Sequence, residues 1–236
     1  MHRNYYFIFW VIVATAFASG QDAKKAMEAE LAGGIGLLNE RYWSPTLGIW
    51  FDKPGDDLRA HFEGRHNPPW WPSANAVETL IDAASATGNT EWMRQVENLY
   101  SLNRDFKNKA PRLIAELQRR GLWTARDEER QRRSAAGSEA DTRGYYVDFV
   151  NEYLDDSGWW GIAWLKMYDR TKDERFLKTA RVIQLHMAKN WKPEKGGGVI
   201  WCEDEDKQVA NAITNQLFAI LSARLFSRTR EPEFLE

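Results

Sequence analysis

Two neighbouring carboxylates, Asp155 and Asp156, are the residues of this chain best suited to acid–base chemistry. They lie between an apolar segment at 145–150 and an expected Gly-Trp-Trp-Gly turn at 158–161, after which apolar residues recur at helical spacing. The pair is therefore expected at or just before a helix N-terminus, beside large aromatic rings. Two acids in such a place can hold a sugar and cleave it. Alternatively, an Asp pair there serves only as a helix cap.

The N-terminus has the pattern of a secretory signal peptide. A short basic start at His2 and Arg3 precedes an apolar run at 5–18, which is shorter than the roughly 20 residues of a membrane-spanning helix. Small residues then precede Gln21, as signal peptidase requires. We therefore expect residues 1–20 to be removed, no stable membrane span afterwards, and a protein that is secreted or held at the cell surface. An uncleaved anchor is the alternative.

Composition limits the partners. The formal net charge of −2 gives no reason to expect binding to nucleic acid or anionic lipid. Cys202 is the only cysteine, so an internal disulfide is excluded and the core must hold the fold. The 4 histidines lack the spacing of a zinc site, so we expect no metal and no cofactor. The 12 tryptophans either fill the core or line a cleft where their rings pack on sugars.

The pattern of apolar residues predicts a chain of helices and an all-α fold. Ser73 is expected to cap one of them, and Asp173 another. A long loop is expected at 42–69, and the segment 107–144 is expected to hold one helix followed by a solvated or mobile insertion. The predicted helices lie at about 22–41, 73–87, 90–103, 113–117, 161–169, 173–190 and 209–227.

One short pattern recurs at Thr87, Thr171 and Thr229. Each threonine follows an amphipathic helix, and each is followed by a capping residue two positions on and by an aromatic residue five positions on. The same hairpin corner thus occurs three times, which indicates an array of helical hairpins. Because the three corners are irregularly spaced, the pattern favours a toroid of hairpins around a central cleft over a strict solenoid.

These motifs resemble those of a known family. The segments 155–161, 196–201 and 211–215 resemble, in order and approximate spacing, the motif series of glycoside hydrolase family 76, the endo-α-1,6-mannanases. Trp70 and Trp71, with the Ser-Ala-Asn segment that follows, resemble the family's first hairpin, and the match covers roughly residues 42–235. The resemblance implies an (α/α)6 toroid. Because such a ring needs twelve helices, residues 21–236 are expected to form a partial domain of about half the ring or slightly more, with an exposed apolar edge.

The family's reaction is hydrolysis of α-1,6-mannosidic bonds with retention, so the resemblance implies a polysaccharide or oligosaccharide substrate, α-mannan. It assigns Asp155 as the nucleophile and Asp156 as the general acid/base. Adjacent residues allow this, since retention needs carboxyl groups about 5–5.5 Å apart and one carboxylate raises the pKa of the other. The candidate substrate-binding residues are Trp70, Trp71, Asn75, Asn151, Trp159, Trp160, Trp201, Asn211 and Asn215. For the last five of these, helix packing is the alternative role.

Other functions remain open at this point. A cell-wall transglycosylase would use the same covalent intermediate. A truncated, non-catalytic protein would bind mannan without cleaving it. A sugar epimerase with a similar toroid is a weaker alternative, because such enzymes depend on histidines in the cleft and this chain has few.

Overall fold

The chain is built almost entirely of helices over the part that its computed structural model describes, residues 4–51, 54, 59, 70–104, 109–135 and 147–235. In chain order the helices are α1 (Asn4–Tyr42), α3 (Trp70–Thr87), α4 (Thr90–Asn103), α5 (Lys109–Arg119), α6 (Ala125–Ala135), α7 (Leu154–Thr171), α8 (Glu174–Lys189) and α9 (Ala212–Thr229). Short 3-10 turns lie at Pro193–Lys195, Glu205–Lys207 and Pro232–Phe234, and β1 (Trp43–Ser44) pairs antiparallel with β2 (Ile49–Trp50). The predicted all-α class is confirmed.

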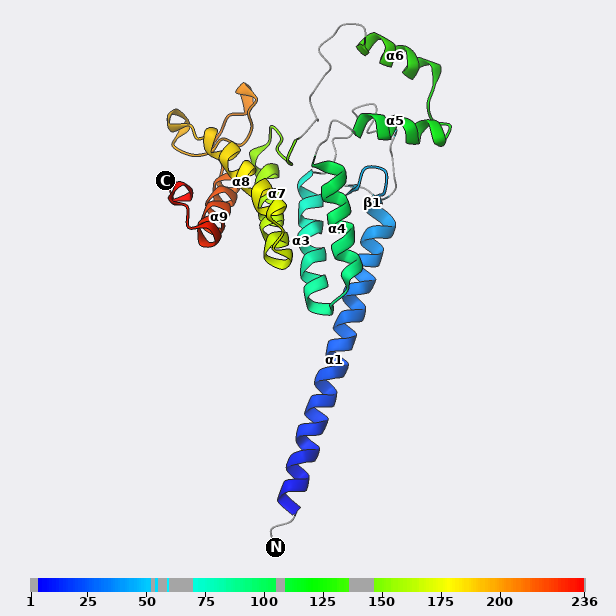
Figure 1. Cartoon of the computed structure of the whole chain (residues 1–236), viewed down its shortest axis with the longest axis vertical. Coiled ribbons are helices and arrows are strands. Elements are labelled where there is room, and N and C mark those ends of the chain that lie inside the picture. The colour runs from blue at the N-terminus through cyan, green and yellow to red at the C-terminus, as the bar shows by residue number, and fades with distance from the viewer. Residues whose placement is uncertain are drawn as a thin grey trace.

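Three helices, α3, α7 and α9, form an inner row in which α7 contacts both neighbours (Figure 1). Helices α4 and α8 follow α3 and α7 through tight corners and pack back on them as hairpins. Because each hairpin reverses the chain, the three inner helices run parallel and their N-terminal ends lie at the same end of the row (Figure 1). This is the arrangement predicted for part of an (α/α)6 toroid.

The three threonine corners have the same geometry in the structure. At each corner the threonine hydroxyl donates to the carbonyl four residues back and accepts the backbone N–H two residues on. The acceptors are Ala83, Met167 and Leu225, and the donors are Asn89, Asp173 and Glu231, at distances between 2.8 and 3.3 Å. The aromatic residues five positions on, Trp92, Phe176 and Phe234, are all buried. The predicted repeat is therefore confirmed as one corner used three times.

The residue after each threonine adopts a left-handed backbone conformation. It is a glycine at the first corner, Gly88, but Lys172 with φ +58° and Arg230 with φ +62° at the others. A residue with a Cβ atom is strained there by about 1–2 kcal/mol. We expect Lys172→Gly to raise the free energy of unfolding by about 0.5 kcal/mol. Relief of the backbone strain is the gain, and it is reduced by the lost contact of Lys172 with the Tyr168 ring and by the greater entropy of the unfolded chain. Urea unfolding measures this, and Gly88→Ala is the matched control, expected to lower stability. A loss of stability in Lys172→Gly would contradict the strain argument.

Glycines let α7 approach its neighbours closely. A Cβ atom at Gly161 would lie 2.6 Å from Cδ2 of Leu221 on α9 and 3.2 Å from Cγ2 of Ile183 on α8. At Gly36, on the exposed side of α1, a Cβ atom would meet nothing within 4 Å. We therefore expect the same substitution to act in opposite directions. Gly161→Ala lowers the free energy of unfolding by about 1–3 kcal/mol through overpacking, and Gly36→Ala raises it by up to about 1 kcal/mol. Thermal unfolding followed by circular dichroism tests both, and equal signs would contradict the packing argument.

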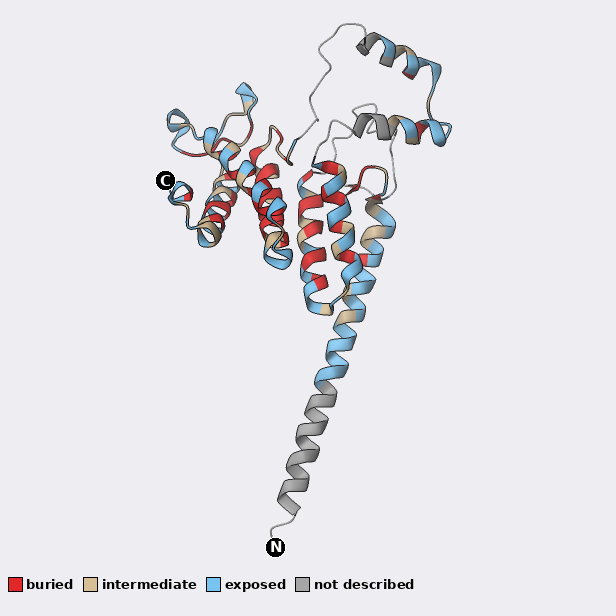
Figure 2. Cartoon of the chain, viewed as in Figure 1, coloured by how far each residue is buried: buried red, intermediate tan, exposed pale blue. Residues whose placement is uncertain are grey.

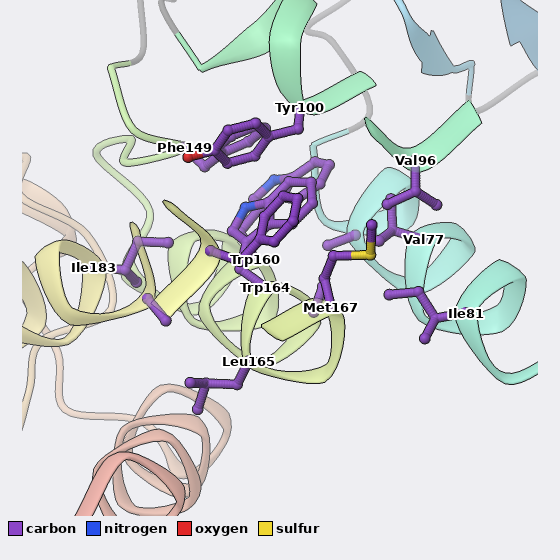
Figure 3. Packing of buried hydrophobic residues seen from close by; sticks show 14 of the residues in the cluster. Val77, Ile81, Val96, Tyr100, Phe149, Trp160, Trp164, Leu165, Met167 and Ile183 are labelled. Atoms are coloured by element: carbon purple, nitrogen blue, oxygen red, sulfur yellow. The ribbon is translucent and has the colours of Figure 1, made fainter. Parts of the chain in front are cut away.

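Aromatic rings fill the centre of the core, where α3, α4 and α7 meet (Figure 3). Trp160 and Trp164 stack with ring centroids 5.4 Å apart, and Phe149 packs 4.8 Å from Trp160. Trp70 joins them 5.1 Å from Trp160. Buried residues lie where the helices face one another, whereas the part of α1 from residue 20 to 34 is mostly exposed (Figure 2).

The first helix is longer than predicted. It begins at Asn4, well before the expected start at residue 22, and side chains up to residue 19 lie outside the described part of the chain. Removal of residues 1–20 stays a prediction. Near its C-terminal end, Asn39 accepts the indole N–H of Trp50 and also bonds Gln95 of α4, which fixes the β1–β2 hairpin to the helices. In the described residues, no helix is both long and apolar enough for a membrane crossing.

Two predicted segments differ from expectation. The predicted loop at 42–69 begins instead with the β1–β2 hairpin, and most of 52–69 lies outside the described residues. The segment 107–144 contains two helices, α5 and α6, where one was predicted, and 136–144 also lies outside the described part. On α9, Ile213 and Ile220 are exposed, although the helical pattern places them on the inward face with Leu217, Leu221 and Leu225, which are buried.

Candidate active site

Each inner helix forms the same pair of hydrogen bonds to the chain segment that precedes it. In each, the fourth residue reaches back and bonds both the N–H and the C=O of a single preceding residue. Ser73 of α3 holds Trp50, Ser157 of α7 holds Asn151, and Asn215 of α9 holds Val199. Ser73 was predicted as a helix cap. Because α3 begins at Trp70, its hydroxyl lies inside the first turn and bonds the hairpin instead.

Asp155 and Asp156 lie in the first turn of α7, at the end of the row where the inner helices begin. Both side chains are partly exposed. Tyr153 occupies the N-cap position and makes no side-chain cap bond. The prediction that the pair stands at a helix N-terminus beside aromatic rings is therefore confirmed. The predicted start of that helix is wrong, because α7 begins at Leu154 and not at about 161, and the expected Gly-Trp-Trp-Gly turn lies inside the helix. The pair's alternative role as the cap is wrong, because both residues follow the N-cap.

Two donors hold the Asp155 carboxylate. Its Oδ1 accepts the backbone N–H of Asp156 at 3.0 Å, and its Oδ2 accepts the indole N–H of Trp201 at 3.0 Å. Burial raises the pKa of Asp155 above its ordinary value, and these two hydrogen bonds oppose that rise because they stabilise the charged form. The arrangement favours a carboxylate with a fixed orientation.

Asp156 has a different environment. Burial, with smaller contributions from the charges of Asp155 and Glu152, raises the pKa of Asp156 to about 7, and a hydrogen bond from Asn151 Nδ2 to its Oδ2 at 3.0 Å opposes the rise. This carboxyl group therefore holds a proton in a large share of the molecules near neutral pH. An acid that keeps its proton, next to a carboxyl group held by two donors, is what acid-assisted nucleophilic cleavage requires.

A buried hydrogen-bond pair supports Asn151. The Ser157 hydroxyl accepts the backbone N–H of Asn151 and donates to its side-chain Oδ1, both at 3.0 Å. Ser157 is completely buried and Asn151 is only 5% exposed. The amide that contacts Asp156 is thus fixed from behind.

A loop residue forms the other side of the site. The backbone carbonyl of Trp201 accepts the N–H of Leu154, which attaches the loop to the start of α7. The Trp201 ring packs against Tyr153 with centroids 5.3 Å apart. Lys207 lies over the Tyr153 ring and donates to its hydroxyl at 3.1 Å and to Asp204 at 2.8 Å. These contacts fix the indole that bonds Asp155.

The structure separates the predicted substrate-binding residues into three groups. Asn151 and Trp201 bond the Asp pair directly, as described above. Trp159 is partly buried and packs against the core, Trp71 is 51% exposed at the start of α3, and Asn75 donates to the Trp71 carbonyl. For these three, a role in binding stays a prediction.

Two of the other four predictions need correction. Trp70 and Trp160 are 2% and 0% exposed in the aromatic core, so their rings have no face for a sugar and helix packing accounts for them. Asn211 is the N-cap of α9, accepting the N–H of Thr214, and Asn215 uses its amide to hold Val199. Both asparagines are partly exposed, and a role of theirs in binding stays a prediction.

Three residues that support the candidate site were not predicted from the sequence: Ser157, Tyr153 and Lys207. Ser157 had a usable signal, because Ser73 stands at the same distance from the start of its helix. The contacts of Tyr153 and Lys207 depend on how the loop folds back, and no local pattern predicts them. Within the described part of the chain, His, Cys, Asp and Glu residues form no cluster of three that could hold a metal ion.

Comparison with known proteins identifies a family and similar folds. The family model of glycosyl hydrolase family 76 matches residues 50–236. Among solved structures, the α-1,6-mannanase of Salegentibacter sp. HEL1_6 is 19% identical, with a TM-score of 0.56 over 88% of this chain and 48% of that one. A family 76 mannosidase from Bacteroides thetaiotaomicron is 18% identical, with a TM-score of 0.56 over 89% of this chain and 50% of that one. No curated protein matches the chain.

The share of each chain that is covered, and the functions of the matched proteins, limit what these similarities show. The chain spans about half the length of the solved structures that it matches. A D-mannose isomerase also matches, at 14% identity and a TM-score of 0.55 over 88% of this chain and 50% of that one. At these identities the likeness establishes the fold, and the fold alone serves more than one reaction. A variant of the Salegentibacter enzyme with two consecutive aspartates replaced by alanine is described as inactive and was solved with α-1,6-mannotetrose.

Proposed function

Because the chain belongs to glycosyl hydrolase family 76, we propose that it is a glycoside hydrolase that cleaves α-1,6-mannosidic linkages in mannan with retention of configuration. The asymmetric environment of two adjacent acids carries this proposal: Asp155 is held by two donors, and Asp156 has a pKa of about 7. The inactive double-aspartate variant of a structural relative, in complex with a manno-oligosaccharide, supports the choice of substrate.

The reaction proceeds in two steps, and Asp155 and Asp156 act in both. In the first, an oxygen of Asp155 forms a bond to the anomeric carbon while the bond from that carbon to the glycosidic oxygen breaks, and Asp156 gives its proton to the departing oxygen. In the second, the ionised Asp156 takes a proton from water as the water oxygen bonds the anomeric carbon and the bond to Asp155 breaks. Two inversions at one carbon give net retention. Trp201 and the Asp156 N–H hold the nucleophile in position before it attacks.

Export is part of the proposal. It is supported by the basic start at His2 and Arg3, the apolar run at 5–18 and the small residues before Gln21. Mannan is a polymer that an enzyme meets outside the cell. N-terminal sequencing of the protein recovered from the culture medium tests this part, and a chain that keeps residues 1–20 inside the cell would contradict it.

Incubation of the purified protein with linear α-1,6-mannan tests the activity. We expect oligosaccharides to be released, and the newly formed reducing end to be α when first detected by proton NMR. A first product of β configuration would contradict retention, and chains longer than those of the starting mannan would indicate transglycosylation. Binding of mannan without release would overturn the hydrolase proposal in favour of a non-catalytic binding protein. An α-1,4-glucan serves as the control polymer.

The two acids predict the shape of the pH profile. Asp156 must be protonated to act as the acid, so kcat/KM should fall about tenfold per pH unit above about pH 7. Asp155 must be ionised, and because burial raises its pKa, the acidic limb should lie above the ordinary Asp value. The two limbs are macroscopic properties of the pair. Initial rates at low substrate between pH 3 and pH 10 measure the profile, and an activity that keeps rising above pH 8 would contradict these roles.

A further inference from the structure

We propose that Ser157 is a positioning residue, which fixes the Asn151 amide so that its NH2 group donates to Oδ2 of Asp156 and leaves Oδ1 to carry the catalytic proton. This inference rests on the proposed function. It concerns a residue that touches neither the substrate nor the reacting atoms and acts only through Asn151.

The comparison with Ser73 shows what is particular to Ser157. Ser73 accepts the N–H of Trp50 at 3.1 Å and donates to the carbonyl of the same residue at 3.2 Å, so its single proton goes to the backbone. Ser157 accepts the N–H of Asn151 at 3.0 Å. Three acceptors lie near its hydroxyl: the side-chain Oδ1 of Asn151 at 3.0 Å, the carbonyl of Tyr153 at 3.3 Å and the backbone carbonyl of Asn151 at 3.4 Å, so Oδ1 is the nearest of them. A hydroxyl has one proton to donate. At α7 that proton therefore goes to the amide oxygen.

Fixing the amide oxygen also fixes the amide nitrogen. With Oδ1 of Asn151 facing Ser157, the NH2 group faces Oδ2 of Asp156 at 3.0 Å. The two supporting residues are 0% and 5% exposed, so water does not compete for these bonds. The three side chains form a directed chain of hydrogen bonds from Ser157 through Asn151 to Asp156.

The direction of this chain determines where the proton of Asp156 lies. A donor at Oδ2 keeps that oxygen as an acceptor, so the proton belongs on Oδ1, which no hydrogen bond from the described residues reaches. If the amide were rotated by 180°, its oxygen would accept the proton from Oδ2 and hold it toward the protein. The charged groups that act on Asp156 are Asp155 and Glu152, and both favour its protonated form. The amide donor is the group that opposes them.

Titration of the Asp156 carboxyl carbon by NMR, in protein labelled with ¹³C-aspartate, tests the inference without substrate. The wild-type midpoint is expected at about 7. Ser157→Ala frees the amide to rotate, so the midpoint should rise by about one pH unit, as expected when a hydrogen bond to a carboxylate is lost. Asn151→Leu should give a similar rise, and the double variant should add nothing further, because both changes act through one bond. Ser73→Ala removes the equivalent bonds at α3 and should leave the midpoint unchanged.

The outcomes separate this inference from the proposed function. The inference would be overturned if the Asp156 midpoint in Ser157→Ala lay within about 0.2 pH unit of wild type while the midpoint in Asn151→Leu rose clearly. The expected shifts in a protein that cleaves no mannan would leave the inference standing and remove the proposed function. In an active protein, Ser157→Ala should lower kcat more than it changes KM and move the basic limb of the pH profile upward by the same amount.

Two measurements cover a Ser157→Ala variant that fails to fold, which its thermal unfolding curve would reveal. Ser157→Thr keeps the hydroxyl and should keep the wild-type midpoint. In the wild-type protein, the side-chain NH2 signals of Asn151 should shift with the same midpoint as Asp156. Signals that do not respond between pH 5 and pH 9 would overturn the inference.

Discussion

Replacing Asp155 by asparagine should lower the rate of mannan cleavage by at least about 10⁴-fold, because the covalent step loses its nucleophile. Asp156→Asn should lower it by about 10²–10⁴-fold, the range of a general acid. Both variants keep the size of the original side chain, and the amide oxygen can still accept one hydrogen bond. Initial rates of oligosaccharide release measure both losses, and circular dichroism checks that each variant keeps the wild-type fold.

An activated substrate separates the two roles. An aryl α-mannoside with a good leaving group needs no proton in the first step. The first step in Asp156→Asn should therefore approach the wild-type rate with this substrate, as a burst of released phenol, whereas Asp155→Asn should stay inactive. Equal losses in both variants would contradict the assignment of nucleophile and acid.

Asp169→Asn is the matched control for both substitutions. Asp169 lies at the other end of the same helix and pairs with Arg228 on the surface. The same chemical change there should leave the rate within about twofold of wild type, because an exposed ion pair contributes little to stability. A large loss in this control would show that changes anywhere in α7 disturb the site.

The elements that the sequence predicts well are those that depend on neighbouring residues. The corners at Thr87, Thr171 and Thr229 follow from one threonine, one cap and one aromatic residue within six positions, and the structure confirms each of them. The position of Asp155 and Asp156 at a helix N-terminus also follows from local pattern, although α7 begins at Leu154 and not at the predicted residue 161. Hydrogen bonds between residues close in sequence form wherever the helix ends, so tertiary packing has little influence on them.

The roles of the tryptophans depend on packing that the sequence does not contain. Trp159 and Trp160 are adjacent, yet a helix turns by about 100° per residue, so one ring lies at the margin of the core and the other inside it. Trp160 shares its side of α7 with Trp164, and that spacing of four was the available signal for a core position. Trp201 enters the site only because its loop is attached to the start of α7.

Asparagine was equally ambiguous. Asn151, Asn211 and Asn215 have the same side chain, but one bonds an acid, one caps a helix and one holds a loop backbone. Each partner is set by which segment comes near the amide. The loop that Asn215 holds is also the one that carries Trp201, so a residue without catalytic contact still supports the position of the nucleophile.

The same burial that suits Asp156 to acid catalysis should destabilise the protein at high pH. Its pKa is about 7 in the folded protein and about 3.9 in an unfolded chain. The folded state therefore holds a proton that the unfolded state has lost between these values. The stabilising effect is complete below about pH 4 and is lost as pH rises through about 7. Asparagine never ionises, so Asp156→Asn should become more stable than wild type as pH rises, by about 2–4 kcal/mol at pH 8.

Urea unfolding of wild type and Asp156→Asn at pH 4, 6 and 8 measures this difference. We expect the two proteins to be similar at pH 4 and the variant to gain stability steadily above it. A difference that stays constant with pH would mean that Asp156 ionises in the folded protein as it does in water, and the same carboxyl group could then not supply a proton at neutral pH. Because the measurement needs no substrate, it tests the acid independently of whether mannan is cleaved.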